Sequence, residues 1–171
     1  LMIMRLWDGF NDPIMGNISD NTRTRWGRRR PFMMAGAVLT AVIYPMIWHP
    51  PTAWGPNVTA IYITIIGLLL FTASTCWAMP YYSLQMELTP NYDERTRISA
   101  WLAFFGKFSN LAGGWMLAII TGPWFVNAAT GKPDIVHGMQ SASWFIAALI
   151  LCFGILPPLF VRERYYEAET S

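Results

Sequence analysis

Charged residues are scarce in this sequence. Asp, Glu, Lys and Arg make up 13% of its 171 residues and 54% are hydrophobic, whereas an ordinary soluble domain carries about 25% charged residues. The hydrophobic residues gather in several runs of about 20, the length that an α-helix needs to cross a bilayer. A soluble domain would have to bury all of these runs, so this composition argues against one. The sequence predicts an all-α, polytopic membrane protein.

Cysteines are few and catalytic motifs are missing. Cys76 and Cys152 both fall within apolar runs, and neither has a His at metal-ligand spacing. We expect them to be small core residues rather than a disulfide or a metal site. The sequence contains no Ser–His–Asp or His-Glu-x-x-His pattern, and GNISDN at 16–21 lacks a phosphate-binding spacing. We therefore expect a protein that is not an enzyme, with no cofactor and no nucleic-acid partner.

Breaks between the apolar runs divide the chain into five segments. They cover about residues 1–19, 32–48, 58–84, 98–126 and 141–161. We expect residues 1–161 to form one transmembrane bundle, and residues 162–171 to be a polar cytoplasmic tail or the start of a linker between bundles. Transporters are often built from inverted triplets of helices, so one further helix in front would complete two triplets. We expect the chain to be a fragment that begins inside a spanning segment.

Basic residues are unevenly divided between the loops. Nine lie in the first loop, the third loop and the tail: Arg23, Arg25, Arg28, Arg29, Arg30, Arg95, Arg97, Arg162 and Arg164. The second and fourth loops together hold only Lys132. Because short cytoplasmic loops carry the excess of Lys and Arg, we expect a multi-pass protein of the cell membrane with its basic loops in the cytoplasm.

Three ionisable residues interrupt the first apolar segment. Arg5, Asp8 and Asp12 recur every three or four residues, so they share one face of a helix. Each costs about 2.5–3.5 kcal/mol at the centre of a bilayer on insertion scales. The shared face must therefore meet protein or water rather than lipid.

This charged face has the composition of a cation site. The carboxylates of Asp8 and Asp12, the neighbouring amide of Asn11 and a backbone carbonyl freed by Pro13 suit a small cation such as sodium, or a proton. We also expect Pro13 to kink or open the helix at this point. In an alternative interpretation the aspartates only neutralise the two basic residues of the membrane segments, Arg5 and Lys107.

Two stretches resemble a known family of transporters. Residues 5–32, RLWDGFNDPIMGNISDNTRTRWGRRRPF, contain in looser form the cytoplasmic signature of the major facilitator superfamily. The whole stretch closely resembles the second helix and following loop of the glycoside–pentoside–hexuronide:cation symporters, the melibiose-permease family. MPYYSL at 79–84 and ERTR at 94–97 resemble the fourth helix and next loop of that family. The resemblance covers helices two to six and implies the N-terminal half of a major facilitator bundle.

The resemblance also implies roles for individual residues. The aspartates that match Asp8 and Asp12 bind the coupling cation in that family, together with a threonine that matches Thr75. Asp20, Arg28 and Arg29 lie in the basic signature loop, which we expect to latch the cytoplasmic ends of the helices between transport states.

The positions that match the family's sugar contacts agree with it less well. Melibiose permeases carry a sugar-binding aspartate where this chain has Ala78 and a sugar-binding arginine where it has Ala103. An aromatic solute contact is kept as Tyr82. Lys107, one turn after Ala103, is a candidate positive group for the cavity or a structural counter-ion. Trp101 and Trp77 are candidate cavity walls.

These observations predict a secondary symporter that couples sodium or a proton to the movement of a sugar or glycoside-like solute. The expected partners are the solute, the monovalent cation, the lipid bilayer and the remainder of the transporter. One alternative is a sodium-dependent symporter of lysolipids or another non-sugar solute, since the two sugar contacts are lost. A second alternative is a non-transporting membrane subunit built on the transporter scaffold.

Overall fold

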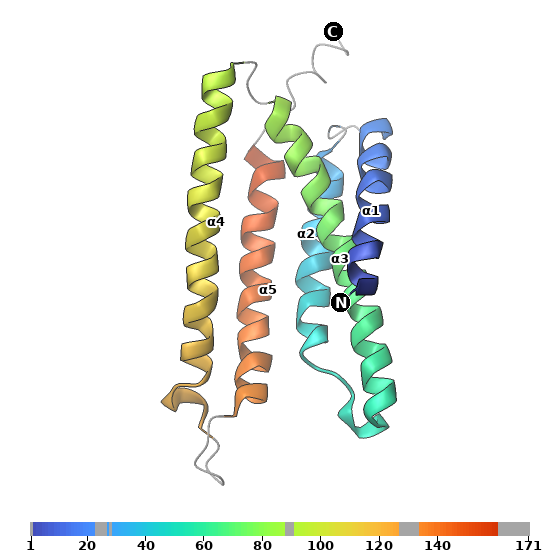
Figure 1. Ribbon diagram of the computed structural model, residues 1–171, viewed down its shortest axis with the longest axis vertical. Helices are drawn as coiled ribbons and strands as arrows, with labels where there is room; N and C mark the ends of the chain where they lie inside the picture. The colour runs from blue at the N-terminus through green and yellow to red at the C-terminus, as the bar shows by residue number, and fades with distance from the viewer. Residues whose placement is uncertain (1, 23–26, 28, 88–90, 127–133, 161–171) are drawn as a thin grey trace. The chain divides into compact units, whose positions relative to one another are not determined.

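The computed structural model describes residues 2–22, 27, 29–87, 91–126 and 134–160. They form five α-helices and two short 3-10 helices (Figure 1). In chain order these are α1 (Met2–Asn21), α2 (Arg30–Ile47), η1 (Thr52–Trp54), α3 (Pro56–Glu87), α4 (Tyr92–Ile120), η2 (Pro123–Phe125) and α5 (Ile135–Phe160).

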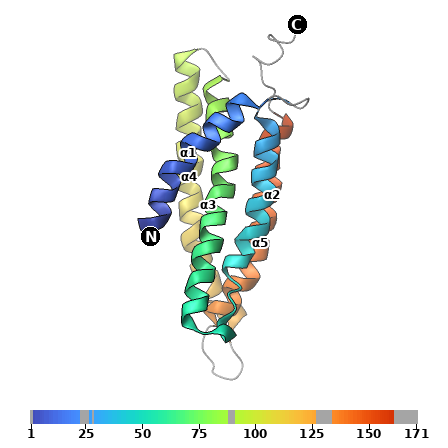
Figure 2. The ribbon, with the colours of Figure 1, turned by 90° about the vertical axis from the view of Figure 1, so that its right-hand side faces the viewer.

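The helices divide between two compact units. The first contains α1, α2, α3 and residues 144–160 of α5, and the second contains α4, η2 and residues 135–143 of α5. In the first unit α3 lies alongside both α1 and α2, as the two views in Figures 1 and 2 show.

Four helices have the length and apolarity of membrane spans. Among the described residues, these are α2, α3, α4 and α5. Large apolar side chains are exposed along them, including Phe104 and Phe108 of α4, which are 61% and 63% exposed. Exposed apolar surface of this extent is typical of a membrane-facing protein. The predicted all-α membrane bundle is therefore confirmed.

Small residues let α2 and α3 pack closely. A Cβ atom added at Gly36 of α2 would lie 2.6 Å from the backbone nitrogen of Trp77 on α3. Ala37, Ala41 and Ala73, on the same two helices, are buried. Helices in membranes associate through such close approach of small residues because lipid supplies no hydrophobic driving force between them.

Two helices begin earlier than the sequence predicted. We expected residues 87–97 to be a loop, but α4 begins at Tyr92, where the side chain of Asn91 accepts a hydrogen bond from the Asp93 amide at 3.3 Å. We expected α5 to begin at residue 141, but it begins at Ile135 and the Asp134 carboxylate accepts a hydrogen bond from the His137 amide at 3.1 Å. Side chains of this kind satisfy amides of the first helical turn. They allow polar residues to be helical where apolarity alone indicates a loop.

Two prolines lie within helices. We expected Pro13 to kink or open the first helix, and the second segment to cover residues 32–48. Helix α1 runs through Pro13 to Asn21, and α2 runs through Pro45 to Ile47. A proline within a helix removes one hydrogen bond, and in a membrane bundle neighbouring groups satisfy the freed carbonyl, so the helix continues.

Candidate cation and solute site

The structure brings one predicted pair of cation ligands together. The Thr75 hydroxyl on α3 donates a hydrogen bond to Oδ1 of Asp12 on α1, at 3.2 Å. Thr75 is only 5% exposed and Asp12 is half-buried. Residues 63 positions apart in the sequence therefore place a carboxylate and a hydroxyl at one point, and both offer the oxygen atoms that small hard cations prefer.

Asn11 lies beside this pair on α1. Its side chain is 9% exposed, and among the described residues its amide nitrogen Nδ2 has no hydrogen-bond partner. Because Pro13 has no N–H, the Gly9 carbonyl also loses its partner within the helix. Position 8 lies one turn before Asp12 on the same helix, and the side chain of Asp8 is outside the described residues.

Trp7 makes a second contact between α1 and α3 that the sequence did not predict. Its indole Nε1 donates a hydrogen bond to the Thr72 hydroxyl at 3.0 Å. Thr72 lies one turn before Thr75, so the two threonines share a face of α3. In the sequence, Trp7 and Thr72 each lie one helical turn from a predicted cation ligand. That spacing alone does not predict that the two bind each other.

Two of the three residues predicted to act as a latch form an ion pair. Nη2 and Nε of Arg29 both donate to Oδ1 of Asp20, at 2.8 Å and 3.0 Å. The Arg29 side chain is 7% exposed and that of Asp20 is 47% exposed. This ion pair joins the end of α1 to the start of α2. The third predicted member, Arg28, is outside the described residues.

The neighbouring Arg30 has a different contact, which the sequence did not predict. Its Nε and Nη2 donate to the carbonyls of Pro158 and Leu159 at 2.6 Å and 2.9 Å. The last carbonyls of a helix have no partner within it and carry partial negative charge. Arg30 therefore caps the C-terminal end of α5. The sequence contains no signal for this contact, because Pro157 and Pro158 free the carbonyls of residues 153 and 154 rather than those that Arg30 binds.

Trp77 serves as a packing residue for three helices. Its Nε1 donates to the Gly154 carbonyl of α5 at 2.9 Å, and its ring stacks on Tyr81 at 4.7 Å between centroids. The Gly154 carbonyl is free to accept this bond because Pro158, four residues on, has no N–H. Trp77 thus satisfies a carbonyl that the helix leaves unpaired.

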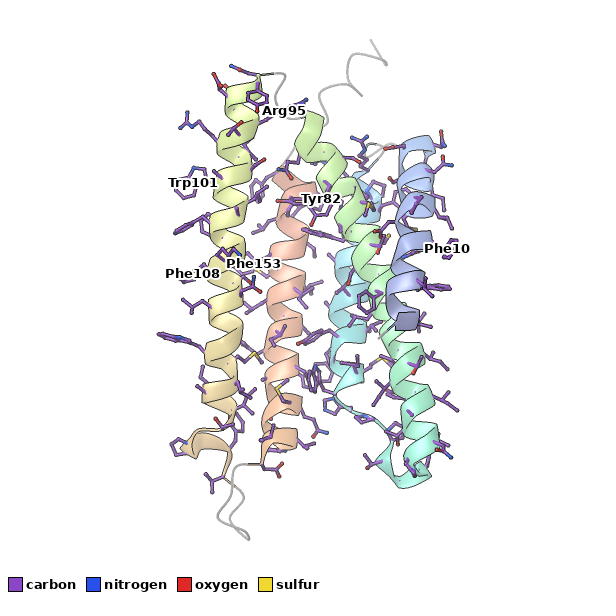
Figure 3. All side chains as sticks on the ribbon, viewed as in Figure 1. Phe10, Tyr82, Arg95, Trp101, Phe108 and Phe153 are labelled. Atoms are coloured by element: carbon purple, nitrogen blue, oxygen red, sulfur yellow. The ribbon has the colours of Figure 1, made fainter. Side chains whose placement is uncertain are left out.

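Beside Trp77 lies an apolar cavity of about 340 Å³. It is lined by residues of α2, α3 and α5: Ala37, Thr40, Ser74, Trp77, Ala78, Ile150, Phe153 and Gly154. Figure 3 labels Phe153 on α5. Ala78, the position of the lost sugar-binding aspartate, therefore faces an apolar space, and Trp77 is a wall of it.

The remaining predicted solute contacts are exposed. Tyr82 on α3 is 56% exposed and contacts Tyr81 edge to face, with ring centroids 5.9 Å apart. Trp101 on α4 is 59% exposed and stacks on Phe105 with centroids 5.8 Å apart. Lys107 is also exposed on α4. The labelled side chains in Figure 3 show Tyr82 on α3 and Trp101 on α4.

Comparison with known proteins identifies the family. The profile of the family described as MFS/sugar transport protein matches residues 1–171. The chain belongs to this family. Within it, the relatives support the glycoside–pentoside–hexuronide:cation symporters, the group that the sequence resembled.

Three relatives illustrate the match. An uncharacterized symporter of Synechocystis sp. is 37% identical over 142 residues, covering 78% of this chain and 24% of the relative. An isoprimeverose transporter of Lactiplantibacillus pentosus is 30% identical over 177 residues, covering 99% of this chain and 34% of the relative. A glucuronide carrier protein homolog of Escherichia coli K12 is 27% identical over 158 residues, covering 90% and 33%. The chain thus spans about a quarter to a third of the length of these relatives.

Membership of this family confirms the predicted fold class and a multi-pass membrane protein. Members of the family are transporters rather than enzymes, in agreement with the absence of catalytic motifs from the sequence.

Proposed function

We propose that this chain forms the N-terminal bundle of a symporter that couples a monovalent cation, sodium or a proton, to the movement of a sugar or glycoside-like solute. Residues 1–161 would be the bundle, and residues 162–171, the predicted tail or linker, lie outside the described part of the chain. The observation that carries the proposal is the bond between Thr75 and Asp12 at 3.2 Å.

The pair supports this function because it links two helices through groups that a cation would take over. A cation bound by Asp12 and Thr75 would favour the arrangement of α1 and α3 in which both oxygens reach it. If the solute prefers the same arrangement, each ligand raises the affinity for the other, and the two are transported together. Asp8 and Asn11 are the further ligands that we propose from the same face of α1.

Asp12→Asn in the full-length protein tests this function. The substitution removes a charge and keeps the size of the side chain. We expect stimulation of solute binding by sodium or by protons to be lost, and solute binding itself to survive with a weaker affinity, since coupling free energies are typically about 1–3 kcal/mol. Solute binding to the purified protein would be measured with and without sodium, balanced by choline, and over a range of pH.

A purely structural role for Asp12 gives a different result. If the carboxylate only neutralises a buried basic residue, its loss leaves that charge unpaired at about 3–5 kcal/mol. The variant would then fail to fold or to express. A well-folded Asp12→Asn protein whose cation dependence equals that of the wild type would contradict the cation site.

A non-sugar solute, such as a lysolipid, is the second candidate. It is favoured by the apolar cavity that Ala78 helps to line, because a sugar needs polar partners and this position has lost its carboxylate. Competition between a labelled glycoside and a short-chain lysolipid for binding to the full-length protein would separate the two. A non-transporting subunit would show no cation-dependent uptake of either in proteoliposomes.

For the orientation, we propose that the basic loops face the cytoplasm, on the Arg distribution described above. A cysteine placed at residue 26 should resist membrane-impermeant thiol reagents in intact cells, and one at residue 132 should react. The opposite pattern of labelling would contradict this orientation.

A further inference from the structure

Two side-chain hydrogen bonds formed by described residues join α1 to α3. One runs from Trp7 Nε1 to the Thr72 hydroxyl at 3.0 Å, and the other from the Thr75 hydroxyl to Asp12 at 3.2 Å. Only the second contains a predicted cation ligand.

Helix geometry places the two bonds on either side of the proposed cation ligands. Successive residues of an α-helix are rotated by about 100°, so Trp7 and Asp12 lie about 140° apart around α1. Positions 8 and 11 fall between them. On the opposite side of the helix, Phe10 is 72% exposed and points away from α3 (Figure 3).

Burial between the two bonds agrees with this arrangement. Asn11, which lies between Trp7 and Asp12 around the helix, is 9% exposed. The two bonds show that this face of α1 packs on α3. Bonds at both edges of the face restrain the rotation of α1 about its own axis in both directions, whereas either bond alone restrains it less.

The two bonds respond differently to a cation. A cation bound by Asp12 and Thr75 would use lone pairs of the carboxylate and of the hydroxyl, the two groups that this bond joins. The geometry of that bond therefore depends on whether the cation is present. The indole N–H of Trp7 has no lone pair to offer, and the Thr72 hydroxyl donates to the Leu68 carbonyl at 2.9 Å while it accepts from Trp7. The Trp7–Thr72 bond can therefore persist when the cation binds.

We propose that Trp7 and Thr72 are positioning residues for the cation site: their bond holds α1 in the rotation at which Asp12 meets Thr75, in both the empty and the occupied state. Neither residue binds the cation or the solute. The inference rests on the proposed cation site at Asp12 and adds the pair that keeps it assembled.

The test uses three variants of the full-length protein. Trp7→Phe keeps an aromatic ring and removes the N–H donor. Thr72→Val keeps the branched shape and removes the acceptor, whereas Thr72→Ser keeps the hydroxyl. Trp54→Phe, at an exposed Trp of η1, is the matched control for a Trp-to-Phe change elsewhere.

The readout is the cation concentration that gives half of the effect on the unfolding temperature of the purified protein in detergent. Sodium would be titrated against choline, and protons would be titrated by pH, each relative to Asp12→Asn, which lacks the site. A ligand that binds only the folded state raises the unfolding temperature according to its affinity.

We expect Trp7→Phe and Thr72→Val each to weaken the affinity for the coupling cation about three- to tenfold, the range for losing one hydrogen bond between membrane helices. Thr72→Ser and Trp54→Phe should match the wild type. The double variant Trp7→Phe/Thr72→Val should be no weaker than either single variant, because both remove the same bond.

Other results overturn the inference. A merely structural role would lower the unfolding temperature in choline without changing the cation dependence. Equal effects of Thr72→Ser and Thr72→Val, or additive effects in the double variant, would also contradict it. If the wild type and Asp12→Asn respond alike to both cations, the proposed cation site fails and this inference fails with it. A wild-type response that Trp7→Phe and Thr72→Val leave unchanged overturns the positioning role alone.

Discussion

Helix α3 contacts its two neighbours, α1 and α2, by different means. Against α1 it makes hydrogen bonds between side chains, Trp7 with Thr72 and Asp12 with Thr75. Against α2 it makes close steric contact, where Gly36 leaves no space for a Cβ atom beside the Trp77 backbone. The bond between Asp12 and Thr75 can exchange partners when a cation binds, whereas a glycine-to-backbone contact has only one arrangement.

The difference follows from the residues that each helix presents. Helix α1 carries ionisable residues within its apolar stretch, and within a membrane these need polar partners from a neighbouring helix. Helix α2 has Gly36, Ala37 and Ala41 on its buried side, so its backbone can approach α3. We infer that α2 and α3 form the fixed part of the first unit and that, between α1 and α3, the bond of Asp12 with Thr75 is the part that adjusts.

The largest effect should come from filling the close contact. Gly36→Leu places a Cβ atom 2.6 Å from the Trp77 backbone nitrogen, and backbone cannot move aside as a side chain can. We expect destabilisation at or above the upper end of the range of about 1–3 kcal/mol for overpacked cores, measured by thermal unfolding of the full-length protein in detergent.

Gly106→Leu is the control for this change, because a Cβ atom at Gly106 meets no described atom within 4 Å. We expect it to unfold close to the wild-type temperature. Equal unfolding temperatures for Gly36→Leu and Gly106→Leu would show that the α2–α3 contact is not the fixed part of the unit.

A smaller effect should follow from removing the bond between Trp77 and α5. Trp77→Phe keeps the ring that stacks on Tyr81 and leaves the Gly154 carbonyl without a donor. We expect a loss of about 1 kcal/mol, above the average of about 0.6 kcal/mol for a hydrogen bond between membrane helices, because the Gly154 carbonyl is left without a donor. In a Pro158→Ala background the restored N–H of residue 158 can serve that carbonyl, so the same substitution should cost less. An equal cost in both backgrounds would contradict the account of Trp77 as the partner of a proline-freed carbonyl.

The smallest effect on stability is expected at the bond that adjusts. Thr75→Val removes the donor to Asp12 and keeps the shape of the side chain, and hydrogen bonds between membrane helices average about 0.6 kcal/mol. Asp12 is only half-buried, so water can replace the lost donor. Cation-dependent solute binding should nevertheless fall sharply. A Thr75→Val protein as unstable as Gly36→Leu would remove the distinction between the two interfaces.

The sequence was sufficient for the class of protein and for the kinds of residue at the site. Breaks between the apolar segments predicted the five helices, and the stretch from Arg5 to Phe32 resembled the symporter family that the comparisons support. The sequence and its resemblance to the family predict Asp12 and Thr75 as cation ligands, and the structure places the two in contact. Such properties depend on local composition and on motifs, which a single sequence contains.

The tertiary structure decided which residues meet. Trp7 bonds Thr72, Arg30 binds carbonyls at the C-terminal end of α5, and Trp77 bonds the Gly154 carbonyl. Each pairing depends on how far one helix is rotated and shifted along another. The partners are 65 or more positions apart in the sequence, and the sequence alone does not specify this rotation and shift. The starts of α4 at Tyr92 and of α5 at Ile135 likewise depended on single side chains, those of Asn91 and Asp134, rather than on hydrophobicity. The sequence determined which groups are available for binding, and only the packing of α1, α2, α3 and the end of α5 determined their partners.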